Sequence, residues 1–236
     1  MRRSDRSRDA RLNGVRPAVA LFDLDGTISD SAPGILSALR LAFAANGLPP
    51  MDEHTERAIL GPPFYESLPP LIGADRVPGV IAAYREHYGE GAMFDTRVFD
   101  GVEDVLVALR AAGVRLAVAT SKPEHYAVPI VEHLGLGGYF ETIGGDELDG
   151  SLGTKALVIG RVLQRLDVPE AGDVRMVGDR SHDIEGARAH GIDCFAVGWG
   201  YAMPGELAAA HPAAICATAP DLAAALGCAE QTDTRV

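Results

Sequence analysis

The chain has 236 residues and a formal net charge of −12, and 47% of its residues are hydrophobic while 23% are charged. These values are typical of a globular protein that is large enough for one big domain, or for a big domain with a smaller one. The acidic balance argues against a nucleic-acid backbone or an anionic membrane as partner, and no apolar run is long enough to span a bilayer. An anionic small molecule is not excluded, because a metal ion and a few cations can reverse the field in one cleft.

Both ends of the chain are polar. Residues 1–16 carry six arginines and no apolar run, so we expect a flexible tail without a secretory signal. A basic docking arm is the alternative, although aspartates dilute its charge. Residues 229–236 are expected to fray. The three cysteines form no CxxC pair, which favours a reduced, cytoplasmic protein; they are Cys194, Cys216 and Cys228.

An apolar run over 19–22 ends in two carboxylates, Asp23 and Asp25, which stand two residues apart. Such a run before a glycine-containing turn is typical of a buried parallel strand. Both carboxylates then lie at its carboxyl end, where open α/β sheets bind ligands. If the alternation of the strand persists, the two carboxylates point the same way. Two negative charges at such a short distance from each other require a cation. Oxygen ligands of this kind suit Mg²⁺.

The next part of the chain has a helical pattern throughout. Asp30, Ser31 and Pro33 are typical of a helix start, with an N-cap candidate and an early proline. Gly47 ends the apolar run that follows. Further helices are expected over 52–60, 64–72 and 80–88, with a break at 61–63 and no convincing strand. We therefore expect an all-helical insert over residues 31–96.

From Gly101 onward, helices alternate with short apolar strands. Strands separated by helices of this length predict crossover units and a parallel sheet, so we expect an α/β, Rossmann-like core over 17–30 and 97–228. The expected strands cover 114–119, 142–144, 174–177, 194–197 and 214–216. The expected helices cover 102–112, 125–134, 155–166, 183–190 and 220–226.

Four groups of polar residues each follow a strand's carboxyl end or open a helix. All carboxyl ends of a parallel sheet lie at one edge, so these groups are expected to meet in one crevice. They are Asp23 with Asp25, Thr120 with Ser121, Lys155, and Asp179 with Asp183.

In this order, the motifs resemble those of haloacid dehalogenase superfamily phosphohydrolases with a helical, C1-type cap inserted after the first motif. The resemblance covers residues 18–226. The motifs read Asp23-Leu24-Asp25-Gly26-Thr27, Ala119-Thr120-Ser121-Lys122-Pro123, Lys155 and Gly178-Asp179-Arg180-Ser181-His182-Asp183. A 5′-nucleotidase-like and phosphoglycolate-phosphatase-like branch is favoured by the last motif together with Gly61-Pro62-Pro63 and Leu148-Asp149-Gly150-Ser151. Ala156 stands where many relatives have a proline after the lysine.

The resemblance implies a role for each motif. Asp23 would attack phosphorus and form an aspartyl-phosphate. Asp25 would protonate the leaving alcohol and then take a proton from water, with Thr27 orienting it. The Thr120 hydroxyl and the Ser121 amide would bind phosphoryl oxygens, and Lys155 would place a positive charge on the phosphoryl group.

Further substrate-binding candidates lie beside the motifs and in the insert. They are Gly26, Lys122, Pro63 and Phe64. A solvated side chain is the alternative for Lys122, and packing inside the insert is the alternative for Phe64. The insert is expected to close over the crevice, exclude water and select the substrate.

The cofactor implied by the resemblance is Mg²⁺. Its ligands would be Asp23, the backbone carbonyl of Asp25, and Asp179, with Asp183 acting through water or a neighbouring ligand. His182 fits a structural or surface role better than a chemical one.

The expected activity is Mg²⁺-dependent hydrolysis of a small phosphorylated metabolite, of the sugar phosphate or ribosyl 5′-phosphate type. A phosphomutase of the same superfamily is the alternative, and a non-catalytic binding module is a weaker one. Dehalogenation is disfavoured, because the relatives that catalyse it lack the second aspartate, here Asp25. The substrate, the pathway and the choice between monomer and dimer stay open.

Overall fold

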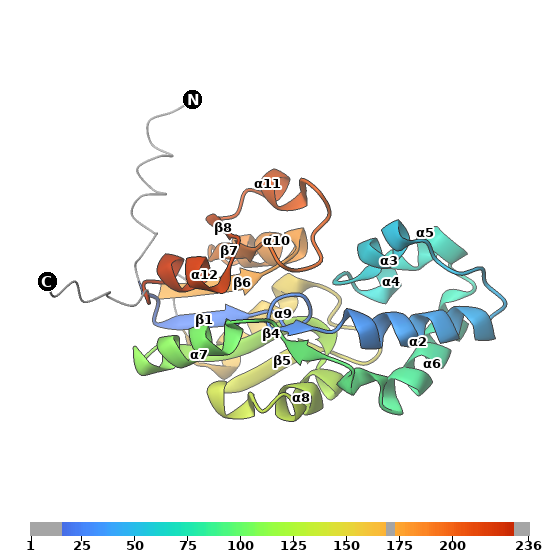
Figure 1. The fold of residues 1–236 in the computed structure, drawn as a ribbon, viewed down its shortest axis with the longest axis horizontal. Helices are drawn as coiled ribbons and strands as arrows, with labels where there is room; N and C mark the ends of the chain where they lie inside the picture. Colours follow the sequence, from blue (N-terminus) through green and yellow to red (C-terminus); the bar gives the residue numbers. More distant parts are fainter. Residues whose placement is uncertain (1–15, 169–172, 229–236) are drawn as a thin grey trace, which may run out of the picture.

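Figure 1 shows a computed structural model of the chain, which describes residues 16–168 and 173–228. The tail and the frayed end that we expected at 1–16 and 229–236 lie outside the described residues, except for Arg16. Among the described residues, no helix combines the length and the apolar character that a membrane span requires.

Six parallel strands form one sheet in the order β5-β4-β1-β6-β7-β8. They are β1 (Val19–Phe22), β4 (Arg115–Pro123), β5 (Thr142–Asp146), β6 (Val174–Gly178), β7 (Asp193–Val197) and β8 (Ala214–Cys216). The first strand lies in the middle, with Val19 opposite both Arg115 and Val174. The predicted Rossmann-like parallel sheet is confirmed, and the carboxyl ends of β4, β1 and β6 are neighbours at one edge.

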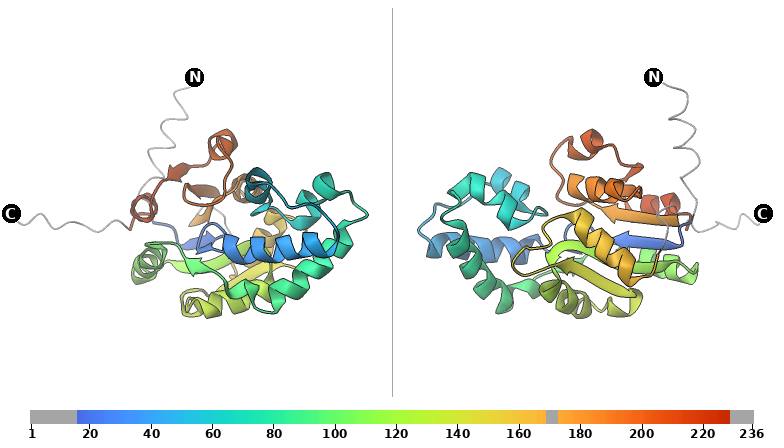
Figure 2. Two further views of the ribbon diagram at one scale, coloured as in Figure 1. Left: turned by 45° about the vertical axis from the view of Figure 1, so that its right-hand side comes forward. Right: turned by 180° about the vertical axis from the view of Figure 1, so that it is seen from behind.

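Helices cover both faces of this sheet, which explains why β1 is apolar throughout. Val19 and Leu21 face α9 (Lys155–Arg165) and α10 (Ser181–Ala189), which lie in front of the sheet in the right-hand view of Figure 2. Ala20 and Phe22 face the opposite side. That side is covered by α7 (Val102–Ala111), α8 (Glu124–His133) and α12 (Ala219–Ala225).

A separate group of helices lies beyond the carboxyl edge of the sheet (Figure 1). We call it the cap; it comprises α2 (Ala32–Ala45), α3 (Glu53–Ile59), α4 (Phe64–Ser67), α5 (Pro69–Ile72), α6 (Val77–Gly89) and η1 (Ala92–Phe94). The chain enters and leaves it through β2 (Ser29–Asp30) and β3 (Arg97–Val98), which pair antiparallel. The expected limits of the insert, residues 31 and 96, adjoin these two short strands.

Several local expectations were wrong. The helix expected over 64–72 divides at Leu68 into α4 and α5, because Pro69 has no N–H to continue the helical ladder. The strand expected to end at Ala119 continues to Pro123. We did not predict the strand pair formed by β2 and β3. We also did not predict the helix α11 (Glu206–Ala210) or the 3-10 turn η2 (Gly137–Tyr139).

The start of α2 is also held differently from our expectation. Ser31 occupies the N-cap position, but its side chain makes no capping hydrogen bond. The hydroxyl of Tyr201 instead accepts hydrogen bonds from the amides of Ser31 and Ala32, at 2.8 and 2.9 Å. A tyrosine of the core therefore fixes the first helix of the cap.

Candidate active site

Three buried carboxylates gather at the carboxyl edge of the sheet. Asp23, Asp179 and Asp183 each offer one carboxylate oxygen, and these three oxygens lie within 4.8 Å of one another. The exposed fractions of the three residues are 5%, 0% and 1%. They come from the end of β1, the turn after β6 and the first turn of α10. We call these three residues the acidic cluster.

Lys155 is the cation of this cluster. Its Nζ lies 2.8 Å from Oδ1 of Asp23 and 2.8 Å from Oδ1 of Asp183, and it donates to the carbonyl of Ala119 at 3.1 Å. The lysine is the first residue of α9, where the side chain of Thr154 caps the helix by accepting from the amide of Leu157. The expected contact between Lys155 and the first motif is therefore present without a following proline.

The charge balance of the cluster favours a further cation. Burial raises the pKa of Asp23 to about 6; Asp183 and Asp25 add to the rise, while Lys155 opposes it. Burial, followed by the charges of Asp183 and Asp23, raises the pKa of Asp179 well above its usual value. Although burial disfavours its charge, Asp183 and Asp23 raise the pKa of Lys155. One ammonium against three carboxylates leaves negative charge uncompensated, so this oxygen donor set fits a divalent ion such as Mg²⁺.

Asp25 lies outside the acidic cluster. After Asp23 the chain turns sharply, and the carbonyl of Leu24 accepts from the amides of Ile28 and Ser29 at 3.0 and 2.9 Å. The carboxylate of Asp25 consequently pairs with Nζ of Lys122 at 2.7 Å. The strand alternation that would have pointed Asp23 and Asp25 the same way does not persist, because β1 ends at Phe22.

The turn residues after Asp25 pack against Asp179. Gly26 has a φ of +82°, and a Cβ there would lie 2.2 Å from Oδ2 of Asp179, so the turn requires glycine. The hydroxyl of Thr27 donates to Oδ1 of Asp179 at 3.4 Å, whereas we expected it to orient Asp25. The amide of Tyr201 donates to Oδ2 of the same carboxylate at 2.6 Å. Asp179 is therefore held from several directions.

The second motif lies at the end of β4, beside Asp25. Thr120 is buried, and its hydroxyl accepts from the amide of Lys122 at 3.2 Å. Lys122 is buried rather than solvated; although burial disfavours its charge, Asp25 holds the pKa of the ammonium above its ordinary value. Ser121 lines the cavities on both sides of the strand end.

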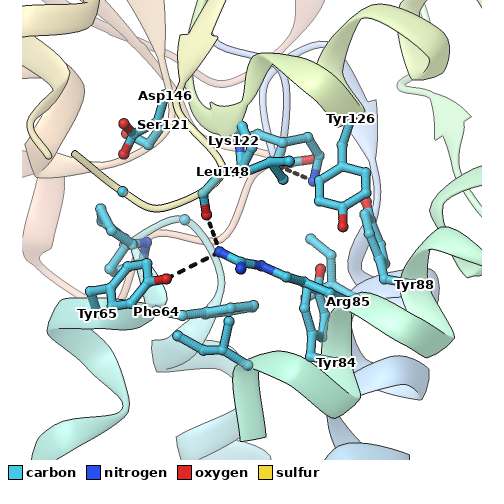
Figure 3. Close-up of a pocket in the computed structure, with 18 of the residues that line it drawn as sticks. Phe64, Tyr65, Tyr84, Arg85, Tyr88, Ser121, Lys122, Tyr126, Asp146 and Leu148 are labelled. Atoms are coloured by element: carbon cyan, nitrogen blue, oxygen red, sulfur yellow. Dashed lines mark hydrogen bonds and ion pairs between the residues drawn. The ribbon is translucent and has the colours of Figure 1, made fainter. Parts of the chain in front are cut away.

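Two cavities reach the site from between core and cap. One is lined by Asp25, Ser121 and Lys122 on the core side and by Pro63 and Phe64 on the cap side. Figure 3 shows that aromatic side chains surround much of it. The other is lined by Pro63, Ser121, Lys155 and His182. Pro63 and Ser121 therefore stand between the two openings.

His182 lies at the second cavity and touches the cap. Its Nε2 is 4.0 Å from a carboxylate oxygen of Glu66, and its Nδ1 is buried with no hydrogen-bond partner in the described part of the chain. It is absent from the acidic cluster.

Sequence reasoning missed residues that support the site. Asp146 ends β5, and its Oδ1 accepts from the amides of Leu152 and Gly153, which shapes the loop before Lys155. Its position after a strand end is the same signal that identified Asp23. Arg180 and Glu206 form an ion pair at 2.9 Å beside the acidic cluster. Glu206 carried no comparable signal, because it lies on a helix that was not predicted.

Comparisons with known proteins agree with this geometry. The family model for haloacid dehalogenase-like hydrolases matches residues 20–197, a span that contains all four motifs. The chain belongs to the haloacid dehalogenase-like hydrolases. The superfamily indicated by the motifs is thereby confirmed.

Several named relatives carry the names of the branch that the motifs favoured, and others are named as a kinase. A 5′-nucleotidase of Pseudomonas aeruginosa is 37% identical over 206 residues, which cover 86% of this chain and 91% of that protein. Phosphoglycolate phosphatases are further relatives. The tyrosine-protein kinase PtkA of Mycobacterium tuberculosis is 45% identical over 195 residues, or 82% of this chain, but the alignment spans 66% of that longer protein.

Solved structures share the whole fold of this hydrolase. The crystal structure of a predicted phosphatase from Clostridium acetobutylicum superimposes with a TM-score of 0.80 at 33% sequence identity. The superposition covers 85% of this chain and 93% of the other.

Proposed function

We propose that this hydrolase is a Mg²⁺-dependent phosphatase that cleaves a small phosphate monoester, of the sugar phosphate or ribosyl 5′-phosphate type, through an aspartyl-phosphate on Asp23. The observation that carries the proposal is the position of Asp23. Its carboxylate belongs to the acidic cluster and is held by Lys155 at 2.8 Å. A fixed carboxylate beside a cation site and a cavity has what phosphoryl transfer requires, since positioning and charge neutralisation supply most of the catalysis.

Mg²⁺ would be held by Asp23, Asp179 and the backbone carbonyl of Asp25, with Asp183 acting through water. When bound, it would neutralise phosphoryl oxygens and relieve the repulsion among the carboxylates. Lys155 would hold the carboxylate of Asp23 in place, and Thr120 with the Ser121 amide would donate to the remaining phosphoryl oxygens.

The reaction would proceed in two steps. The carboxylate of Asp23 attacks phosphorus, the bond to the leaving oxygen breaks, and Asp25 gives that oxygen its proton. Asp25 then takes a proton from a water molecule, which attacks phosphorus and releases inorganic phosphate with regeneration of Asp23. Asp25 lines the first cavity, which supports its role as the acid that protonates the leaving group.

The relatives support a phosphatase, since the names 5′-nucleotidase and phosphoglycolate phosphatase both denote enzymes that hydrolyse phosphate monoesters. The PtkA proteins are named as kinases, but the alignment leaves about a third of their length unmatched. Asp25 also argues against dehalogenation. The free thiols of all three cysteines fit the cytoplasm.

A panel of nucleoside monophosphates, sugar phosphates and phosphoglycolate tests the proposal, with release of inorganic phosphate measured with and without Mg²⁺. We expect Mg²⁺-dependent turnover of at least one ester and its loss in Asp23→Asn. Stimulation by a sugar bisphosphate, with little net phosphate release, would instead favour the phosphomutase. If no ester releases phosphate and no isomer forms, the result would favour the non-catalytic binding module.

A further inference from the structure

Aromatic rings form a continuous wall along the cavity beside Asp25. The ring of Tyr84 stacks on that of Tyr88 with centroids 5.0 Å apart and an interplanar angle of 17°. Phe64 meets Tyr84 edge-on at 4.7 Å, and Tyr126 meets Tyr88 edge-on at 5.3 Å. These rings come from α4, α6 and α8, and Figure 3 shows them from the bottom to the right of the pocket. The cap and the core therefore both contribute to one aromatic surface.

This wall begins at the catalytic groups. Nζ of Lys122 lies 2.7 Å from the carboxylate of Asp25 and 5.0 Å from the ring centroid of Tyr88. In the proposed reaction, Asp25 gives its proton to the oxygen that links phosphate to the rest of the substrate. The group on the far side of that oxygen consequently faces the tyrosines.

One hydroxyl in the wall lacks a partner. The side chain of Tyr88 is 1% exposed, and among the described residues no group forms a hydrogen bond with its Oη. Burial, followed by the charges of Asp25 and Tyr126, raises the pKa of this hydroxyl well above its usual value, although the neighbouring hydroxyl of Tyr84 opposes the rise, so it stays a donor. A buried donor without an acceptor is unfavourable, and an acceptor atom on a ligand would satisfy it.

Two charged groups of the cavity are already engaged. Lys122 pairs with Asp25, and Asp146 accepts from backbone amides of its own loop. At the mouth, the guanidinium of Arg85 donates to the hydroxyl of Tyr65 at 3.1 Å and to the carbonyl of Leu148 (Figure 3). Both of these partners are neutral, so the positive charge of Arg85 stays available to a ligand. A sugar alone would place several hydroxyls against rings. A flat ring would stack on the tyrosines, and the planar guanidinium suits the same kind of surface.

We propose that the group esterified to phosphate carries a flat aromatic ring with a hydrogen-bond acceptor on its edge, held by Tyr84, Tyr88 and Tyr126. This inference rests on the proposed phosphatase function and names its substrate class. The ring is a nucleobase or a substituted phenol; both present a flat face and edge acceptors.

A matched pair of esters tests the ring itself. Benzyl phosphate and cyclohexylmethyl phosphate both release a primary alcohol of similar size, but only the first is flat. We expect kcat/KM to be at least about tenfold higher for benzyl phosphate, since stacking on aromatic side chains contributes about 1–3 kcal/mol per base where it has been measured. A ratio near one would overturn the inference while leaving the phosphatase intact.

Two further pairs distinguish the source of the ring. Adenosine 5′-monophosphate is compared with ribose 5-phosphate, and O-phosphotyrosine with O-phosphoserine, by their binding affinities for Asp23→Asn, because a phenol leaves more readily than an alcohol and would bias a comparison of rates. The pair with the larger ratio of affinities identifies the ring. If no ester is hydrolysed, the proposed function fails. Calorimetric binding of benzylphosphonate and cyclohexylmethylphosphonate still decides the inference, because equal affinities would overturn it and tighter binding of the benzyl compound would support it.

Variants assign the preference to the wall. Tyr126→Leu should bring the benzyl to cyclohexylmethyl ratio close to one. The conservative Tyr88→Phe keeps the ring but removes the donor, so it should lower kcat/KM about fivefold for the preferred natural ester and leave the benzyl ratio in place. Tyr139→Phe is the control, because that hydroxyl bonds to Glu103 away from the cavity. Unchanged ratios in Tyr126→Leu would contradict the proposal.

Discussion

Asp23 and Asp25 stand two residues apart but have different partners. Asp23 is held by Lys155 within the acidic cluster, whereas Asp25 is held by Lys122 beside the aromatic wall. The turn that begins after β1 separates them, and Gly26 makes that turn possible. In the proposed reaction, Asp23 would face the phosphoryl group and Asp25 would face the leaving group, as a nucleophile and an acid require.

Replacing the acid tests this division. Asp25→Asn should lower kcat for an alkyl phosphate by about 10²–10⁴-fold, the usual contribution of general acid–base catalysis. The loss should be smaller for 4-nitrophenyl phosphate in a pre-steady-state burst, because that leaving group departs without a proton. Asp100→Asn is the control, since Asp100 is exposed and lies in the turn before α7. Equal losses for both substrates in the burst would contradict the assignment.

Two arginines join the cap to the core near the acidic cluster. From α3, Arg57 donates to the carbonyls of Gly200 and Ala202, at 3.2 and 3.0 Å. From the turn after β6, Arg180 donates to the carbonyl of Leu60 at the end of α3. Arg180 also pairs with Glu206 at 2.9 Å. The position of α3 is therefore tied to the loop that carries Asp179.

Loosening this connection should weaken substrate binding. Arg57→Ala removes hydrogen bonds worth about 1 kcal/mol, so we expect KM to rise about fivefold with a smaller change in kcat. Arg40→Ala is the matched control, because Arg40 pairs with Glu56 at 2.6 Å inside the cap. Steady-state kinetics of both variants decide the matter, and an equal rise of KM in the control would refute the role of Arg57.

Glu206 supplies a prediction about acid stability. Although burial opposes it, hydrogen bonds from Arg180 and the amides of Ser181 and Met203 lower the pKa of Glu206 from 4.5 to about 2. The folded state thus favours the ionised form, so the stabilisation is complete above about pH 4.5 and is lost as pH falls toward 2. Glu206→Gln should lower the urea midpoint at pH 7, and the difference from wild type should shrink below pH 4.5. A difference in urea midpoint that does not depend on pH, or one equal to the difference caused by Glu86→Gln at an exposed position, would contradict this prediction.

Long and periodic elements could be predicted from the sequence, and short ones could not. The apolar run of β1 and the helical spacing of α2 are local signals that tertiary packing did not change. β2 and β3 are two residues each and pair only through the fold. The motif residues could be placed because each follows a strand end or opens a helix. Tyr84 and Tyr88 share a helix face, but their partner Tyr126 lies on another element, so the aromatic wall had no linear signature.

The whole molecule should depend on a cation for part of its stability. The three carboxylates of the acidic cluster are buried against one ammonium, and burial raises the pKa of Asp23 and of Asp179. We therefore expect the ionised cluster to oppose folding when no metal is bound. We expect Mg²⁺ to raise the melting temperature; at a concentration of 100 Kd the gain is about 2.7 kcal/mol. Asp179→Asn should be more stable than wild type without metal and should lose the Mg²⁺-dependent rise. Melting curves with Mg²⁺ and with a chelator measure both effects, and a rise that survives in Asp179→Asn would place the cation elsewhere.

Detection of the phosphorylated enzyme is the most direct test of catalysis by Asp23. A ³²P-labelled ester that the enzyme hydrolyses is mixed with Mg²⁺ and the protein, quenched in acid within milliseconds, and the peptides are mapped. We predict that the label resides on Asp23, that hydroxylamine removes it, and that Asp23→Asn neither takes up label nor turns over. Near-normal turnover in Asp23→Asn, or label on a different residue, would contradict covalent catalysis by Asp23.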